Sequence, residues 1–246
     1  MKDYLYDGTF EGLLTCIYHN YYTEKASGIF DVKSYQPSML NGFDEIATEE
    51  DKAMRVYDAI DKKISPYALR RIYRVFLSND EGKETKILKY VVLGFKVGRS
   101  ISSLHGNTVV FDVQAIDKKI WAERERMLQF VRFSGMKGGM LYAPIEPDND
   151  VLELIAEHFC DRLKNEPFII HDVKRDKAIF AYHRQWYVAS FNRNEVPEES
   201  SEEIIYKKLW KNYFDNIAIM ERKNPRCQKN FMPVRYWKHL TECTTQ

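Results

Sequence analysis

The apolar residues of this chain change their spacing near Gly138, and this change constrains the fold more than any other feature of the sequence. Between residues 45 and 133 they recur every three or four positions, which is the period of amphipathic helices. From residue 140 to residue 191 they form mostly short runs divided by polar turns, which is typical of strands. A run of helices followed by a run of strands predicts the α+β class.

Helical periodicity predicts several segments in the first half of the chain. Ser65-Pro66 marks one start, because Ser caps helices well and Pro fits the first helical position. Thr48 followed three residues later by Asp51 resembles a capping box and predicts another start. A strand at Tyr4–Tyr6 comes before the first helix. The predicted helices cover approximately residues 10–21, 48–60, 66–76, 86–95 and 117–133.

The second half reads as a strand, a helix capped by Asp148, and then three strands joined by short turns. Short turns require antiparallel pairing. We therefore expect an α+β fold in which a helical cluster packs with an antiparallel sheet of about four to five strands. We expect a single domain over residues 1–246, with a possible helical sub-region at 45–133 and a C-terminal basic segment at 204–246. The predicted strands are Met140–Ile145, Phe168–Val173, Ala178–Tyr182 and Trp186–Phe191.

Composition excludes several classes of protein. With 44% hydrophobic and 30% charged residues, the 246-residue chain is neither disordered nor membrane-spanning in character. Its four cysteines lack any C-x-x-C spacing, so we predict no metal site, no iron–sulfur cluster and no cofactor. Reduced thiols, the acidic N-terminal residues and the lack of an apolar run of about 20 residues predict a cytoplasmic location and no membrane partner.

The net charge of +1 hides two oppositely charged segments near the C-terminus. Residues 195–203 are acidic, whereas residues 221–240 contain six lysines and arginines and one glutamate. Cations interleaved with aromatic rings can hold phosphates and stack on bases. The alternative is that the aromatic residues pack this segment against the core. The candidate nucleic-acid-binding residues are Arg222, Lys223, Arg226, Lys229, Arg235, Tyr236 and Trp237.

A second group of residues is a weaker candidate for catalysis. A carboxylate beside a histidine can shift the imidazole pKa toward the working pH, so His171-Asp172 is a possible acid–base couple. An ordinary hydrogen bond at the end of a strand explains the pair equally simply. The candidates for a common cleft are His158, Arg162, His171, Asp172 and Arg175. The common hydrolase, zinc-protease and dinucleotide-binding motifs are absent from the sequence.

Several segments together resemble a family of bacterial probable DNA metabolism proteins that contain a domain of unknown function. They are residues 124–133 (RERMLQFVRF), residues 142–147 (YAPIEP), the helix with Phe159 and Arg162, the W-x-x-Y-F motif at 210–214, and residues 232–237 (MPVRYW). The resemblance covers most of the chain. It implies a domain that occurs beside a radical S-adenosylmethionine protein of DNA modification or repair, or fused to a uracil-DNA glycosylase-like domain. This chain resembles the free-standing version, and any radical chemistry would belong to the partner.

Three hypotheses follow from the sequence. The first is an accessory protein in DNA repair or modification that binds DNA, a radical S-adenosylmethionine partner, or both through the basic aromatic segment. The second is a nucleic-acid-processing enzyme, such as a nuclease, a glycosylase or a deaminase, with its site near His158, His171 and Asp172. The third is a protein–protein interaction module that uses the Tyr-rich N-terminal helices. Whether the chain is an enzyme stays open at this point.

Overall fold

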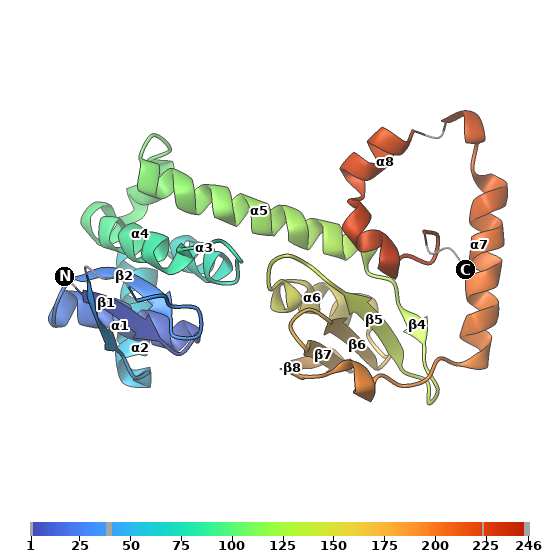
Figure 1. The fold of residues 1–246 in the computed structure, drawn as a ribbon, viewed down its shortest axis with the longest axis horizontal. Coiled ribbons are helices and arrows are strands. Elements are labelled where there is room, and N and C mark those ends of the chain that lie inside the picture. Colours follow the sequence, from blue (N-terminus) through green and yellow to red (C-terminus); the bar gives the residue numbers. More distant parts are fainter. Residues whose placement is uncertain (1, 38–40, 223, 244–246) are drawn as a thin grey trace. The chain divides into compact units, whose positions relative to one another are not determined.

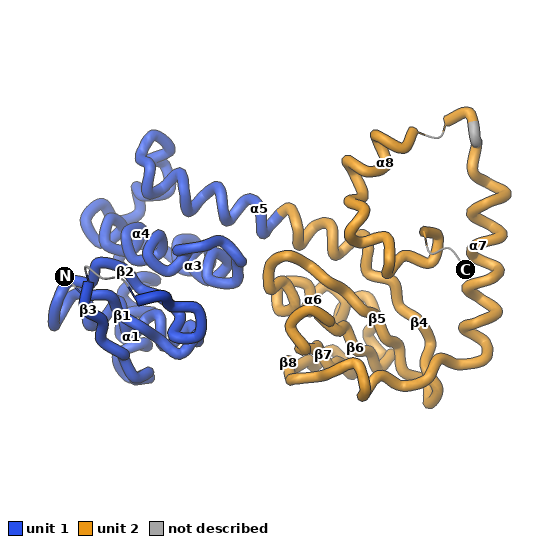
Figure 2. The backbone as a smooth tube through the Cα atoms, in the orientation of Figure 1, with its two compact units in different colours: residues 1–121 blue, residues 122–246 orange. Residues whose placement is uncertain are grey.

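The computed structural model describes residues 2–37, 41–222 and 224–243. The chain forms two compact units, residues 1–121 and 122–246, and the boundary between them lies within one long helix, α5 (Thr108–Phe130) (Figure 2). The α+β class is confirmed (Figure 1). A single domain over the whole chain stays a prediction.

Unit 1 contains a parallel sheet in the order β2-β1-β3, formed by β1 (Lys2–Tyr6), β2 (Ala26–Asp31) and β3 (Gly42–Glu45). The helix α1 (Phe10–Tyr22) connects β1 to β2, as parallel pairing requires. The predicted first strand and helix are confirmed. The sequence reasoning did not identify β2 and β3, which are short and contain glycine and acidic residues.

Helices make up the rest of unit 1, and their start signals agree only in part with prediction. Ser65 caps its helix as predicted, with its Oγ accepting a hydrogen bond from the Ala68 N–H at 3.1 Å. The capping box at Thr48 is wrong, because the Thr48 hydroxyl donates to the Asp7 carboxylate at 2.8 Å instead. The helices are α2 (Glu50–Ala59), the π-helical turn η1 (Ile60–Ile64), α3 (Pro66–Phe76), α4 (Lys83–Val97) and the 3₁₀ turn η2 (Gly98–Ser103), followed by α5.

A buried ion cluster joins α3 to α5 in unit 1. Asp117 accepts hydrogen bonds from Arg71 Nε at 3.1 Å and from Arg74 Nε at 2.5 Å, and all three side chains are almost fully buried. Arg71 also donates to the hydroxyl of Tyr90 on α4. Charges removed from water are tolerated only when they are paired in this way. The cluster therefore fixes how these three helices pack.

Unit 2 contains a five-stranded sheet in the order β4-β5-β6-β7-β8 (Figure 1). The predicted meander of three strands is confirmed, but the prediction of a wholly antiparallel sheet is wrong, because β5 and β6 pair in parallel. The helix α6 (Leu152–Arg162) lies between these two strands and makes the crossover that parallel pairing needs. The strands are β4 (Ser134–Gly135), β5 (Leu141–Ile145), β6 (Phe168–Asp172), β7 (Lys177–Tyr182) and β8 (Gln185–Ser190).

The two faces of this sheet are covered differently. On one face Phe133 stacks edge-on against Phe159 of α6 and against Phe168 of β6. The opposite face carries an apolar cluster made of Met136, Tyr142, Ile169, Ala178 and Phe191. Successive residues of a strand point to opposite faces, so neighbouring residues of β6 belong to different layers.

The C-terminal part of unit 2 begins with α7 (Ser201–Ile217), which is capped by the Ser200 hydroxyl and lies beside the β4 edge (Figure 1). It continues through η4 (Met220–Arg222), α8 (Pro225–Phe231) and η5 (Val234–His239). No residue of α7 is buried. Within the described ranges, no helix has both the length and the apolar character needed to cross a membrane.

The buried ion cluster makes a prediction about stability. Replacing Asp117 by Asn leaves two buried guanidinium groups without a counter-charge, so we expect D117N to lower the free energy of unfolding by about 3–5 kcal/mol. Urea denaturation followed by circular dichroism measures this change. The matched control is D112N on the same helix, where the side chain is exposed and the expected change is below about 0.5 kcal/mol. Equal effects of the two substitutions would contradict a stabilising role for the cluster.

Candidate nucleic-acid interface

The pair His171-Asp172 does not form an acid–base couple in this fold. The two residues are adjacent on β6, so their side chains point to opposite faces of the sheet. The imidazole of His171 is fully buried, where its Nδ1 lies 2.8 Å from the Tyr142 hydroxyl and its ring packs edge-on against Phe191. Burial lowers the pKa of His171, which favours the neutral imidazole. These contacts are those of a core histidine.

Asp172 instead belongs to a clamp around Arg175. The Arg175 guanidinium donates to the Asp172 carboxylate at 2.7 Å and to the carbonyls of Pro147 and Asp148. Burial raises the pKa of Asp172, although the charge and hydrogen bonds of Arg175 act in the opposite direction. The clamp ties the turn between β6 and β7 to the loop that follows β5.

The other two catalytic candidates lie elsewhere. His158 and Arg162 are exposed on α6, where the His158 ring packs edge-on against Phe159. Of the five candidates, the described contacts join only Asp172 and Arg175. In the part of the chain that the structure describes, no group of three or more His, Cys, Asp or Glu side chains is placed to hold a metal ion.

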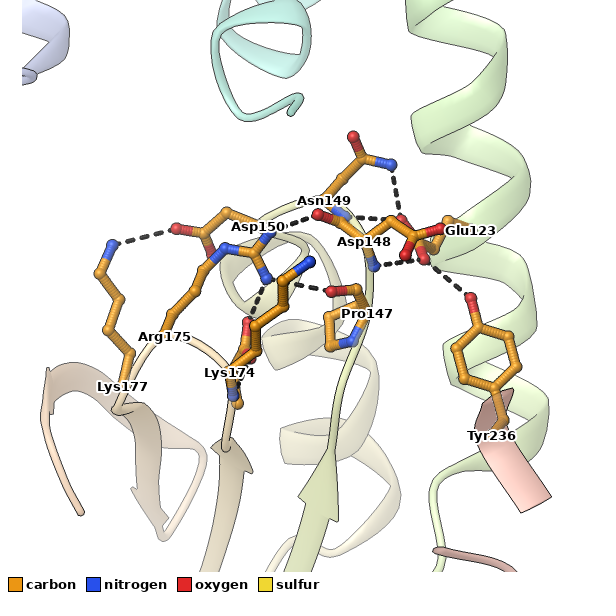
Figure 3. A network of polar contacts seen from close by, with 10 residues as sticks. Glu123, Pro147, Asp148, Asn149, Asp150, Lys174, Arg175, Lys177 and Tyr236 are labelled. Carbon is orange, nitrogen blue, oxygen red and sulfur yellow. Dashed lines mark hydrogen bonds and ion pairs between the residues drawn. The ribbon is translucent and has the colours of Figure 1, made fainter. Parts of the chain in front are cut away.

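A buried carboxylate on α5, which the sequence reasoning did not single out, organises the same region (Figure 3). Glu123 accepts hydrogen bonds from the backbone N–H groups of Asp148 and Asn149 at 2.8 and 2.9 Å, and from the Asn149 side-chain amide at 2.6 Å. The hydroxyl of Tyr236 donates to it at 2.8 Å. Burial alone would raise the pKa of Glu123, but these hydrogen bonds outweigh it and the pKa is lowered.

This network uses two of the residues that the sequence proposed for nucleic-acid binding. Tyr236 is buried, with 3% of its surface exposed, and it packs against Phe130. Arg235 lies over the Tyr236 ring and pairs with Asp148 at 2.9 Å and with Glu123 at 3.7 Å. For these two residues the alternative reading holds, because they fasten the C-terminal segment to the core.

The remaining candidates that the structure describes lie on and around α8. Arg222, Arg226 and Lys229 are exposed, and none of them forms an ion pair with another described side chain. Trp237 is half-buried, and its indole N–H donates to the Met232 carbonyl at 2.9 Å, which fixes the orientation of the ring. Lys223, also a candidate, lies outside the described residues.

Three of these residues line one hollow of about 720 Å³ between α7, α8 and η5. Arg222 and Lys229 contribute positive charge, and Trp237 contributes an aromatic wall. The rest of the lining is mainly apolar and includes Phe214, Ile217 and Ile219, with Asp215 and Glu242 as its carboxylates. Glu242 is neutralised by Arg132 at 3.0 Å. We call this surface the basic hollow.

The basic hollow matches the chemistry of a single-stranded nucleic-acid site. Lys and Arg side chains neutralise phosphates, and an indole ring can stack on a base of any sequence. Sequence reasoning missed Phe214 and Ile219 as lining residues because they lie on the preceding helix and turn rather than in the basic segment. The apolar repeat of α7 is the sequence feature that could have identified them, because no residue of this helix is buried in the described structure.

A second surface lies nearer the start of α7. A groove of about 820 Å³ runs between α7, the end of α5 and α6, with Phe133, Phe159 and Leu163 on one wall and Tyr206, Trp210 and Tyr213 on the other. At about 100° per residue, seven apolar residues of α7 occupy about half of its circumference. Each is between 39% and 64% exposed. We call this the α7 face: Ile205, Tyr206, Leu209, Trp210, Tyr213, Phe214 and Ile217.

The lowered pKa of Glu123 makes a prediction about pH. A carboxylate whose folded pKa lies below its usual value of 4.5 contributes stability above that pH and loses the contribution as pH falls through the folded pKa. We expect E123Q to lower the free energy of unfolding at pH 7 by about 1.5–3 kcal/mol, the range for hydrogen bonds to a charged group. The deficit relative to the unmodified protein should shrink below pH 4.5.

Urea denaturation at neutral and acidic pH measures both effects. E157Q, an exposed carboxylate on α6, is the matched control and should change the free energy of unfolding by less than about 0.5 kcal/mol. A deficit in E123Q that stays constant over the whole pH range would contradict the assignment.

Comparison with known proteins identifies a family but supplies no function. A family model described as DUF4130, a domain of unknown function, matches residues 81–242, a range that contains the Glu123 network, the groove beside α7 and all residues of the basic hollow except Cys243. No curated protein and no solved structure matches the chain. Because the match covers more than half of the sequence, the chain belongs to the DUF4130 family.

Proposed function

We propose that this chain is an accessory protein in DNA repair or modification that binds single-stranded nucleic acid at the basic hollow. One observation carries the proposal: Arg222 and Lys229, which form no ion pair with a described side chain, line the same cavity as one oriented indole ring. The resemblance to probable DNA metabolism proteins supports the process, and it names a radical S-adenosylmethionine protein as the partner that performs the chemistry.

The enzyme hypothesis has less support from the geometry. Its two central residues, His171 and Asp172, are both fully buried, and they lie on opposite faces of the sheet. A general base must lie within hydrogen-bond reach of the proton that it removes, and neither side chain lines the groove beside α7 or the hollow over β6, β7 and β8. We therefore propose a binding role for the chain.

The proposal predicts salt-dependent binding that depends on three cations. Replacing Arg222, Arg226 and Lys229 by Ala removes the two cations that line the hollow and one exposed cation beside them on α8, which together we expect to make three phosphate contacts. For single strands, each contact contributes about 0.7 to the slope of log affinity against log salt, so we expect the slope to fall by about two. Fluorescence anisotropy with labelled single- and double-stranded DNA at several salt concentrations measures this slope.

The matched control is K118A/K119A/K164A, which removes three exposed cations that do not line the hollow and should leave the slope unchanged. W237L tests the aromatic wall separately. It should weaken binding of single strands by about 1–3 kcal/mol and leave the salt slope unchanged, because a ring contributes stacking and no charge. Binding that is undetectable, independent of salt or equally reduced in the control triple variant would contradict the proposal.

A second candidate function, a protein–protein interaction module, is favoured by the α7 face. Monomeric soluble proteins rarely leave a contiguous apolar surface of this kind uncovered. Three cations line the adjoining groove, but Arg132 is paired with Glu242 and Lys207 with Glu199. Arg162 forms no ion pair with a described side chain. We infer an occupant that presents an apolar helix ridge with a carboxylate placed to meet Arg162, and we propose that it belongs to the radical S-adenosylmethionine partner.

This inference predicts that L209D abolishes binding of the purified partner, because a buried charge has no counter-charge in an apolar contact. N212D places the same charge on the polar side of α7 and is the matched control. Calorimetry in the absence of DNA measures both affinities. Equal binding by the two variants would exclude the α7 face. A dimer of the chain alone in sedimentation that is dissociated by L209D would assign the face to a second copy.

A further inference from the structure

Unit 1 contains an aromatic cavity of about 350 Å³ that the proposed function does not use. It lies between α1, α2, η1 and α4, and its main walls are Tyr18, Tyr21, Tyr22 and Phe95. Arg55 and Lys63 also line it. Its volume is near the lower end of the range for ligand pockets, about 300–1,000 Å³, so it fits one small molecule or one nucleotide rather than a protein segment.

The tyrosines come from two successive turns of α1. Positions 18, 21 and 22 are three and four residues apart, so they lie on one side of the helix. The Tyr18 and Tyr22 rings stack with their centroids 4.4 Å apart, and Tyr21 meets Phe95 of α4 edge-on at 5.6 Å. Tyr21 and Tyr22 are 45% and 75% exposed. The cavity therefore offers large aromatic surfaces to a ligand from solvent.

The hydroxyl groups of these tyrosines are also available. Within the described part of the chain, none of the three forms a hydrogen bond with a protein group. Burial raises the pKa of Tyr21, so its phenol stays protonated at neutral pH and can donate. Each ring thus combines a stacking surface with a free donor.

The π-helical turn brings the two cations to one side of the cavity. In a regular α-helix the direction of a side chain drifts by about 40° every four residues, so residues 55, 59 and 63 would turn gradually away from one another. The wider turn at Ile60–Ile64, closed by the Ser65 N–H to Ile60 carbonyl bond at 3.0 Å, reduces this drift. Lys63 therefore lines the same cavity as Arg55 and Ala59.

The charges of the lining residues determine which charge a ligand can carry. No carboxylate of the described residues lines the cavity, and neither Arg55 nor Lys63 is ion-paired with a described side chain. A third cation, Lys52, lies over the Tyr18 ring at 5.5 Å, but it is paired with Glu49. Aromatic cages that bind cationic ligands lack such basic residues, because like charges repel. The cavity therefore fits a flat ligand that carries a negative charge.

We propose that this cavity binds a nucleoside phosphate unit, with its base against the tyrosine and phenylalanine rings and its phosphate on Arg55 and Lys63. Arg forms paired hydrogen bonds with phosphate, and Lys adds a point charge. The unit has two possible sources, a free mononucleotide or the phosphorylated end of a single strand. This site is separate in sequence from the basic hollow of unit 2, and the inference does not depend on the function proposed there.

Calorimetric titration of the full chain tests the site with four probes: thymidine 5′-monophosphate, thymidine, inorganic phosphate and a 5′-phosphorylated oligothymidylate. We expect saturable binding of the monophosphate. Thymidine lacks the phosphate and inorganic phosphate lacks the base, so each of them should bind more weakly by about tenfold or more. Binding of the monophosphate but not of the oligonucleotide supports a site for free nucleotides. Binding of the oligonucleotide supports a site for the phosphorylated end of a strand, provided that R55A weakens it.

Variants separate this site from other sources of affinity. R55A and Y22L should each weaken binding of the monophosphate by about tenfold. R70A and Y57L remove an exposed cation and an exposed tyrosine that do not line the cavity, and they should bind as the unmodified protein does. Circular dichroism of each variant confirms that it is folded.

The triple variant R222A/R226A/K229A distinguishes failure of this inference from failure of the proposed function. It should retain full affinity for the monophosphate, since those cations lie in unit 2. The inference is overturned if neither nucleotide probe binds saturably, or if R55A and Y22L bind as tightly as their controls. It is also overturned if the triple variant loses monophosphate binding while R55A keeps it.

Discussion

The second unit depends on one buried carboxylate. Glu123 is 2% exposed, and it receives hydrogen bonds from the loop after β5 and from the C-terminal Tyr236. A group of this kind is costly to bury unless all of its acceptor positions are used, and here backbone, amide and phenol donors use them together. As a result the C-terminal segment has a fixed attachment to α5. The positions of Arg222, Lys229 and Trp237 around their common hollow follow from this attachment.

Local patterns in the sequence predicted the elements that depend on interactions between residues close together in the chain. The Ser65-Pro66 start of α3 and the three strands of the meander were found because a cap and two short turns are encoded within a few residues. The strands β2 and β3 were missed because their partner, β1, is distant in sequence. The parallel pairing of β5 with β6 was missed although α6 lay between them, and a strand–helix–strand order is itself the signal for such a crossover.

The candidate site was also predicted only in part, because the sequence shows which charges are close along the chain but not which distant residues pair with them. Charge counting located the basic segment, but it did not distinguish a cation that faces solvent from one that is paired in the fold. Arg235 and Tyr236 look as suitable for nucleic acid as Lys229 does, yet their partners Glu123 and Asp148 lie about a hundred residues earlier in the chain. Only the three-dimensional contacts separate the residues that fasten the segment from those that remain available.

The uncovered α7 face also affects how the protein behaves at different concentrations. Apolar contact between two such helices is a bimolecular process, so its extent grows with the amount of free chain, while a bound partner removes the helix from this equilibrium. On the proposed assignment of the α7 face, the quantity of chain with an uncovered α7 is tied to the quantity of the partner that binds this helix. Equal amounts of the two would then leave few uncovered α7 helices to meet one another.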